Sequence, residues 1–135
     1  MKILTIHADF IEFEPKKKAL KEAEEAKGKK RINECLVIFT AVEKRDEENT
    51  KEIVKRYLQE ITDIAQQVKA KKIVLYPYAH LSSGLVSPAK ALTIMKDAEK
   101  ELAKTFKVIR APFGWYKSFD ISCKGHPLSE LSREF

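Results

Sequence analysis

The lysine at position 117 is the side chain whose type and surroundings most favour a chemical role. It lies in the segment Tyr116 to Cys123, where apolar and polar residues alternate with the period of a β-strand. Lys117 shares one face of this predicted strand with Phe119, Ile121 and Cys123, and we expect that face to be buried. An ammonium group at the rim of an apolar face is costly unless it has a partner or a function. Lys117 is therefore either a strand-end residue that extends to water or a cation directed into a cleft.

Two further titratable residues could complete a site with Lys117. His80 follows the short apolar segment Ile73 to Tyr78, and ligands of open α/β sheets bind beyond the carboxyl ends of parallel strands. This histidine could contact a ligand, although a solvated or capping role fits the pattern as well. Glu130 lies between two leucines, so it could orient Lys117 and keep it charged, or it could be an exposed helix charge.

Other kinds of chemistry lack a matching motif. The chain has neither a glycine-rich phosphate loop nor a G-x-S-x-G elbow, so Ser82 and Ser83 gain no support as nucleophiles. The three histidines do not have metal-ligand spacing, and we predict no metal and no cofactor. His7 could face the same crevice as His80 or lie in the core, and His126 could cap a helix.

Composition indicates one globular domain spanning residues 1–135. No apolar segment approaches the ~20 residues of a membrane-spanning helix, and the first residues carry no signal-peptide pattern. Cys35 and Cys123 lie in apolar segments, which favours buried free thiols in a reducing compartment. The net charge of +6 fits either a polyanionic partner or the Lys/Glu-rich surface of a heat-adapted protein.

The elements that must position these residues follow from hydrophobic periodicity. A helix over Thr50 to Lys69 has apolar residues at steps of three and four, and Asn49 with Glu52 resembles a capping box at its start. Ser87 and Pro88 start a second helix as cap and first residue. We also expect six strands and a short final helix: strands Ile3–Ala8, Phe10–Phe13, Glu34–Val42, Ile73–Tyr78, Phe106–Ala111 and Tyr116–Cys123, and helix Pro127–Arg133.

This order predicts a single α/β domain with a mixed sheet. The three middle strands and the two long helices form central β-α-β-α-β crossovers, which we expect to be right-handed. Hairpins flank this centre at both ends of the chain, and Pro112 and Gly114 mark the turn of the second hairpin. The charged segment Pro15 to Lys30 could hold a helical turn or a loop.

Three stretches, the last in two parts, together resemble a known family: Ile6–Asp9, Tyr76–Ser83, and Ala111–Lys117 with Ile121–Arg133. The sequence closely resembles the N-terminal editing domain of archaeal threonyl-tRNA synthetases, a family that shares its fold with the D-aminoacyl-tRNA deacylases. The resemblance covers essentially the whole chain, and it implies a D-aminoacyl-tRNA deacylase-like fold.

The resemblance implies a proofreading reaction. Such domains hydrolyse L-serine from threonine tRNA after the synthetase body has attached it by mistake. A synthesis site built for threonine rejects serine weakly, because the missing methyl group is worth only about 1–3 kcal/mol. A second pocket that clashes with this methyl group admits serine and releases it. Attack by water, assisted by the 2′-hydroxyl of the terminal adenosine, would explain why the sequence shows no covalent nucleophile.

The resemblance also implies all but one of the expected site residues. The exception is His7, which we include because of its place on the first predicted strand. Lys117, with Glu130 as its partner, helps to hold the substrate and the attacking water. Trp115 stands where some family members carry tyrosine, so an aromatic wall is kept. The expected catalytic residues are Lys117, His80, Glu130 and Tyr116, and the expected substrate-binding residues are Val42, Ala79, Trp115 and His7.

Expected partners follow from the same resemblance. It implies a cytoplasmic homodimer that acts on the acceptor end of seryl-tRNA, with the catalytic and anticodon-binding regions of a synthetase in the full-length protein. A domain cut at its linker and a chain that acts alone both fit the sequence. Two other functions stay open. A D-aminoacyl-tRNA deacylase would hydrolyse D-esters and spare L-serine, whereas a non-catalytic tRNA-binding or dimerisation module would bind charged tRNA and leave the ester intact.

Overall fold

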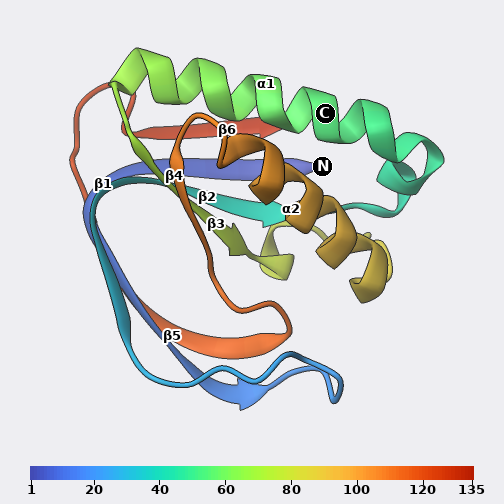
Figure 1. Cartoon of the computed structure of the whole chain (residues 1–135). Coiled ribbons are helices and arrows are strands. Elements are labelled where there is room, and N and C mark those ends of the chain that lie inside the picture. The colour runs from blue at the N-terminus through green and yellow to red at the C-terminus, as the bar shows by residue number, and fades with distance from the viewer.

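The computed structural model describes all 135 residues and contains one six-stranded sheet and two helices (Figure 1). The strands are β1 Lys2–Lys18, β2 Lys30–Ala41, β3 Lys72–Pro77, β4 Lys107–Arg110, β5 Trp115–Cys123 and β6 Glu130–Glu134. The helices are α1 Thr50–Val68 and α2 Pro88–Leu102, and two short 3₁₀ helices are η1 Lys44–Asn49 and η2 Ala79–Leu81. Neither long helix is apolar enough to cross a membrane.

The sheet combines parallel and antiparallel strands in the order β4-β3-β2-β1-β5, which confirms the predicted α/β class with a mixed sheet. β2, β3 and β4 are parallel and are connected by α1 and α2, so the central β-α-β-α-β order is also confirmed. β1 runs antiparallel to β2. Its other edge pairs with β6 along Lys2–Ile6 and with β5 along Ala8–Lys18, so β6 and β5 follow each other along one edge.

The central strands are apolar on both faces, and both faces are covered. In β2, Leu36 and Ile38 face the helices, whereas Val37 and Phe39 face the opposite side. The helix side holds the larger core, to which α1 contributes its apolar stripe. On the other side, the far halves of β1 and β2 curl over the sheet together with β5, as Figure 1 shows. The curled strands therefore cover the face of the sheet opposite the helices.

The curl of β1 has a local cause at Asp9. The sequence predicts two strands here, but the structure has a single strand with a bulge, because the register with β5 shifts between Ala8 and Phe10. Opposite Asp9, Glu34 of β2 has a positive φ of 49°. The Lys124 ammonium group contacts both carboxylates, at 2.6 Å from Asp9 Oδ1 and 2.8 Å from Glu34 Oε2. An ion-pair triad therefore fastens the bend.

The helix starts follow the predicted signals with one exception. Asn49 Oδ1 accepts a hydrogen bond from the Glu52 amide at 3.2 Å, which confirms Asn49 as the cap of α1. Pro88 is the first residue of α2, as predicted. The Ser87 side chain, however, makes no capping hydrogen bond.

The predicted final helix Pro127–Arg133 is wrong. The segment instead enters β6, in which Glu130 is opposite Ile6 and Glu134 is opposite Lys2. The alternation of Leu131 with polar neighbours suits a strand. The open edge of β1 supplies backbone partners to every second residue, whereas an isolated helix this short is unstable.

The predicted hairpin at Pro112 and Gly114 is also wrong. β4 pairs with β3 and β5 pairs with β1, so the two strands lie at opposite edges of the sheet. The segment after Pro15 starts as strand, because β1 continues to Lys18, and the rest of it is turn and loop. This turn packs against the 112–115 segment: the amides of residues 19 and 20 donate to the Gly114 carbonyl at 2.8 and 3.1 Å.

Candidate active site

A cavity of about 420 Å³ opens where the carboxyl ends of β2 and β3 meet the start of β5. Its walls come from residues 40–42, residues 76–80, the segment leading into α2, the turn before β5, and residues 19 and 20. The lining is mostly hydrophobic and contains no carboxylate. Its place beyond the ends of two parallel strands is where ligands of α/β sheets usually bind.

Six of the eight residues predicted for the site line this cavity, and they come from the end of β2, the loop after β3 and the start of β5. They are Val42, Ala79, His80, Trp115, Tyr116 and Lys117. His7 and Glu130 are not part of the lining. The parallel pairing of β2 with β3 and the curl of β1, which carries β5, bring the three segments together.

Lys117 is half-buried in the cavity wall without an anionic partner. Its Nζ donates hydrogen bonds to the carbonyl oxygens of Pro112 at 2.9 Å and Trp115 at 3.1 Å, and it lies 5.0 Å from the centre of the Tyr76 ring. Burial lowers the pKa of Lys117 to about 8. The pairing expected with Glu130 is not formed, because two backbone carbonyl groups hold the ammonium group instead.

An aromatic cluster forms the wall next to Lys117. Phe39, Tyr76, Tyr78 and Phe119 pack with ring centres 5.0 to 6.2 Å apart. All of these except Phe39 line the cavity. Phe119 is 40% exposed, so the face of β5 that we expected to be buried is open at this residue. The cluster offers flat apolar surfaces to a ligand.

His80 lies at the mouth of the cavity, in η2. Its side chain is exposed, and its ring contacts Tyr78 edge-on with the ring centres 5.2 Å apart. The loop that follows is anchored beyond the cavity: Ser82 Oγ donates to Glu43 Oε2 at 2.8 Å, and the Lys44 amide donates to a loop carbonyl at 2.9 Å. The anchored loop holds His80 at the rim with its imidazole open to a ligand.

The opposite rim is built from Trp115, Tyr116 and the turn after β1. Trp115 Nε1 donates to the Glu24 carbonyl at 2.8 Å, which fastens the turn to β5. Gly114 has a φ of 80°, and a Cβ there would lie 3.0 Å from the Ala23 Cβ, so this close approach requires glycine. Tyr116 projects outward and is 59% exposed.

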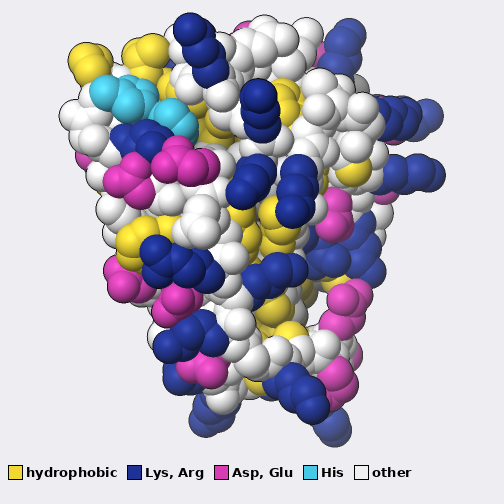
Figure 2. Space-filling model, turned by 60° about the vertical axis from the view of Figure 1, so that its left-hand side comes forward, with side chains coloured by type: hydrophobic (Ala, Val, Ile, Leu, Met, Phe, Trp, Pro, Cys, Tyr) yellow, Lys and Arg dark blue, Asp and Glu magenta, His cyan; other side chains and the backbone are white.

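His7 belongs to a different group of side chains, at the bend of β1. His7 Nδ1 lies 2.7 Å from His126 Nε2, and the Leu128 amide donates to His126 Nδ1 at 3.2 Å. The His126 proton is therefore on Nε2, directed at His7 Nδ1. Burial, His126 and the nearby Lys124 lower the pKa of His7. Figure 2 shows histidine side chains beside basic and acidic ones on this face.

Glu130 lies near the same bend, at the opposite end of β5 from Lys117. Its Oε1 is 3.7 Å from Cys123 Sγ, and its side chain is exposed. No three His, Cys, Asp or Glu side chains are arranged to hold a metal ion. Both cysteines are free thiols, and burial raises the pKa of Cys35 to about 11, so this thiol is inert.

Several lining residues were missed from the sequence: Leu20, Thr40, Tyr76, Phe113 and Phe119. A usable signal exists for Tyr76, which lies one residue before the end of the apolar strand β3, close to the loop that carries His80. Leu20 has no such signal, because its place in the lining depends on how the turn after β1 packs against Gly114.

This arrangement suits attack by water on an ester. No serine, cysteine or carboxylate lines the cavity. The one lining threonine, Thr40, is engaged, since its Oγ1 lies 2.6 Å from the Tyr57 hydroxyl and donates to the Ile38 carbonyl. Lys117 is the only lysine or arginine in the lining. A cation in an apolar wall stabilises negative charge that develops on a carbonyl oxygen.

Comparison of the sequence with known proteins identifies the family. The family described as the archaea-specific editing domain of threonyl-tRNA synthetase matches residues 1–135. The chain is 54% identical over 136 residues to a threonine–tRNA ligase of Methanococcus maripaludis strain C7, covering 99% of this chain and 22% of the relative. It is 55% identical to that of Methanobrevibacter smithii and 54% identical to that of Thermococcus sibiricus, each covering 98% of this chain and 22% of the relative.

The match extends over the whole chain but over only part of each relative. The chain spans about a fifth of the length of the curated relatives it matches. The family model matches the whole chain, and more than half of the aligned residues are identical in the relatives. The chain belongs to the family of archaea-specific editing domains of threonyl-tRNA synthetase.

Proposed function

We propose that this domain hydrolyses L-serine that has been attached by mistake to threonine tRNA. The observation that carries the proposal is Lys117, a cation in the wall of an apolar cavity that is lined by no serine, cysteine or carboxylate. The family to which the chain belongs supports an editing role. The choice of serine rests on the threonyl-tRNA synthetase family to which the chain belongs and on the chemistry of the error to be corrected.

The reaction is an ester hydrolysis with water as the nucleophile. Water attacks the seryl carbonyl carbon, the bond from that carbon to the ribose oxygen breaks, and the proton lost by water goes to that oxygen. The products are free serine and uncharged tRNA. Lys117 Nζ uses two hydrogens for the carbonyls of Pro112 and Trp115, so the ammonium form has a third N–H for the substrate.

His80 and Tyr116 stand on opposite rims of the cavity and position the adenosine end of the substrate. Val42 and Ala79 line the cavity, and we assign to them the contacts that exclude the methyl group of threonine. Rejection by steric clash is needed because a missing methyl group alone changes binding by only about 1–3 kcal/mol. We retain His7 and Glu130 as supporting residues outside the cavity.

The test is deacylation of L-seryl-, L-threonyl- and D-seryl-tRNA for threonine by the purified domain. We expect the L-seryl ester to be lost while the L-threonyl ester survives. Cleavage of the D-seryl ester alone would reassign the domain to a D-aminoacyl-tRNA deacylase. Survival of all three esters, with tRNA bound, would indicate a non-catalytic binding module. Lys117→Met serves as the inactive control.

The remaining assignments concern the setting in which the domain acts. We propose that it receives the acceptor end of seryl-tRNA as part of a longer synthetase in the cytoplasm, because its relatives are threonine–tRNA ligases about five times its length. Fusing the domain to such a synthetase should lower the apparent KM for seryl-tRNA and leave the rate of the chemical step unchanged. An unchanged KM in the fusion would contradict this assignment.

A further inference from the structure

We propose that a basic hollow beside the cavity binds a backbone phosphate of the tRNA, an inference that rests on the proposed function. The hollow has a volume of about 240 Å³ and is lined by nine residues. Four of them are cationic and none is acidic: Lys27, Lys29, Lys30 and Arg110 are the cations. It therefore differs in kind from the apolar cavity, which has no comparable group of charges.

The hollow and the cavity lie on two sides of one short segment. Pro112 lines the hollow, and its carbonyl oxygen accepts the hydrogen bond from Lys117 Nζ at 2.9 Å in the cavity wall. Phe113 and Gly114, the next residues, line the cavity. A ligand that fills both sites therefore needs to cross only the 112–114 turn. An aminoacyl group in the cavity places the nucleotides that precede it at this rim.

Three of the four cations are available to an anion. Lys27 and Lys30 are exposed and form no ion pair, and Lys29 has only a 3.6 Å contact with Glu12. Arg110 is different, because its Nε lies 2.9 Å from Glu99 Oε1, which neutralises it. The lysines thus give the hollow a net positive charge without an internal counter-ion.

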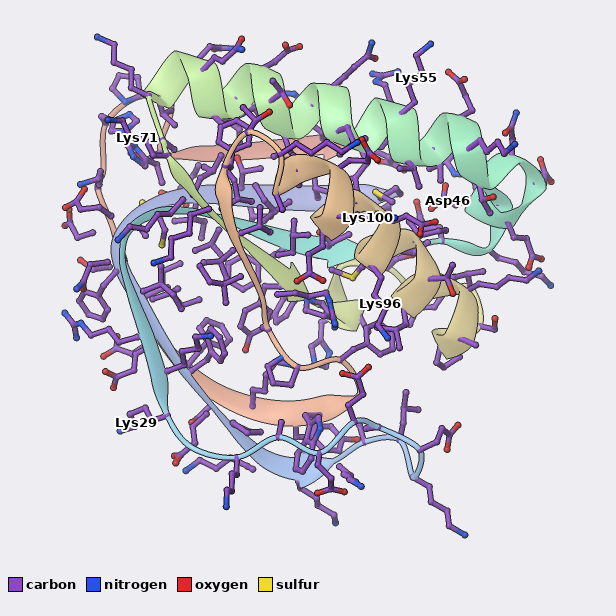
Figure 3. All side chains as sticks on the ribbon, in the orientation of Figure 1. Lys29, Asp46, Lys55, Lys71, Lys96 and Lys100 are labelled. Atoms are coloured by element: carbon purple, nitrogen blue, oxygen red, sulfur yellow. The ribbon has the colours of Figure 1, made fainter.

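The backbone around Gly28 gathers these lysines. Gly28 has a φ of 88°, a left-handed conformation that reverses the chain just before β2, so that residues 27, 29 and 30 line the same hollow. Figure 3 shows Lys29 at the end of the molecule opposite α1 and Lys55. Lys29 therefore lies far from the lysines of α1.

A phosphodiester is the ligand that this chemistry favours. Lysine ammonium groups bind phosphate as point charges, and each neutralised phosphate releases counter-ions, which makes binding depend on salt. The proposed substrate is an ester at the end of a chain of nucleotides joined by phosphodiesters, so a phosphate arrives next to the cavity whenever the ester enters it. We assign the hollow to a phosphate in the 3′ strand of the tRNA.

The test compares a double variant, Lys27→Gln with Lys30→Gln, against a matched control. The control is Lys51→Gln with Lys55→Gln, which removes two exposed and unpaired lysines from α1. For the hollow variant we expect KM for seryl-tRNA to rise about 10-fold at low salt, with kcat unchanged. The slope of log KM against log salt should fall by roughly 1, because the one phosphate that these lysines neutralise contributes about 0.7 to 0.9 to this slope. The control should match the unmodified domain.

A second substrate separates phosphate binding from effects on the cavity. Seryl-adenosine ester without any phosphate should be hydrolysed equally by the unmodified domain and the hollow variant. Loss of activity toward this ester in the hollow variant would overturn the proposal, as would a KM for seryl-tRNA equal to that of the control. Competition by inorganic phosphate with full-length tRNA, at equal ionic strength, would show that a free anion can occupy the same site.

Binding of uncharged tRNA distinguishes failure of this proposal from failure of the proposed function. If the domain hydrolyses no ester, its Kd for uncharged tRNA should still rise about 10-fold in the hollow variant and not in the control. An unchanged Kd would overturn the phosphate site whatever the catalytic result. Circular dichroism and Tm confirm that both variants are folded.

Discussion

At the scale of single residues, Lys117 combines a chemical role with a cost to folding. We expect Lys117→Met to lower kcat/KM for seryl-tRNA by roughly 100-fold or more, as loss of a group that stabilises an oxyanion does. Tm should stay the same or rise, because the half-buried ammonium group has no anion to offset its lost hydration. Steady-state deacylation and thermal unfolding measure both effects.

Two further variants make this result interpretable. Lys100→Met removes an exposed lysine of α2 that forms no ion pair, so it should leave both activity and Tm unchanged. Glu130→Ala should reduce kcat/KM by less than Lys117→Met, since Glu130 does not contact the lysine. Full activity in Lys117→Met would show that the role assigned to Lys117 is wrong.

The lowered pKa of Lys117 predicts how activity depends on pH. With a pKa of about 8, the ammonium form is present below that value and is lost above it. If the charged form holds the substrate, kcat/KM should fall as pH rises from 7 to 9, after spontaneous ester hydrolysis is subtracted. An increase over the same range would mean that the neutral amine is the active form. The residual activity of Lys117→Met should lack this transition.

His7 predicts a pH dependence of stability rather than of activity. Its pKa is lowered in the folded state by burial, by His126 and by Lys124, so the unfolded chain binds the proton more readily. The free energy of unfolding should therefore decrease as pH falls from 7 through about 6.5, the usual histidine pKa. Denaturant titrations at several pH values test this. In His7→Gln the decrease should be smaller, and an equal decrease would contradict the assignment.

At the scale of elements, the 112–115 turn joins three parts of the site. It carries the carbonyls that hold Lys117, it packs against the turn after β1, and it forms the wall between the cavity and the basic hollow. The pattern Pro112-Phe113-Gly114 predicted a turn correctly. The sequence did not predict which parts of the sheet this turn connects. β4 and β5 do not pair with each other, and the turn crosses from one edge of the sheet to the other.

Gly114→Ala should be destabilising and should reduce activity. A Cβ here meets Ala23 and Leu20 at 3.0 and 3.1 Å and forces a positive φ on alanine, at a cost of about 1–3 kcal/mol. The matched control is Gly125→Ala, which has a similar φ of 81° but no atom within 4 Å of the added carbon. Denaturant unfolding should show a larger loss for Gly114→Ala, and equal losses would mean that the close packing of the turn contributes nothing.

At the scale of the whole molecule, apolar surface gathers around the mouth of the cavity. Leu85, Tyr116 and Phe119 are 43%, 59% and 40% exposed, and all three line the cavity. Exposed apolar groups of this kind mark interaction sites. We assign these groups to contacts with the substrate, and the homodimer that the family resemblance implies is a separate prediction. Sedimentation velocity should give a mass near twice 15.5 kDa at micromolar concentration, and a single monomeric species at all concentrations would contradict this prediction.

The sheet also explains how a site forms from distant segments. The ends of β2 and β3 lie side by side because these strands are parallel, and the curl of β1 carries β5 across to meet them. The bend depends on Asp9, Glu34 and Lys124, three residues whose charges look unremarkable in the sequence. None of these residues touches the cavity, yet together they fix the strand that carries Lys117.

Features that depend on near neighbours along the chain could be predicted from the sequence. Three of these features are local: the periodicity of α1 and α2, the apolar sequences of β2 and β3, and the alternation that places Lys117 with Phe119. The family resemblance instead accumulates along the whole chain. They could be predicted because three- and two-residue periods reflect the geometry of a helix and a strand. Six of the eight expected site residues accordingly lie together in one cavity.

Only the folded structure shows which strands pair with each other and which side chains are in contact. The last segment became β6 because the edge of β1 was open to it, and His7 met His126 because β1 passes the loop before β6. Lys117 took two backbone carbonyls in place of Glu130, since Glu130 in β6 lies beside Cys123, at the other end of β5 from Lys117. Strand pairing and the satisfaction of a buried charge depend on contacts between distant residues, and a local pattern does not encode them.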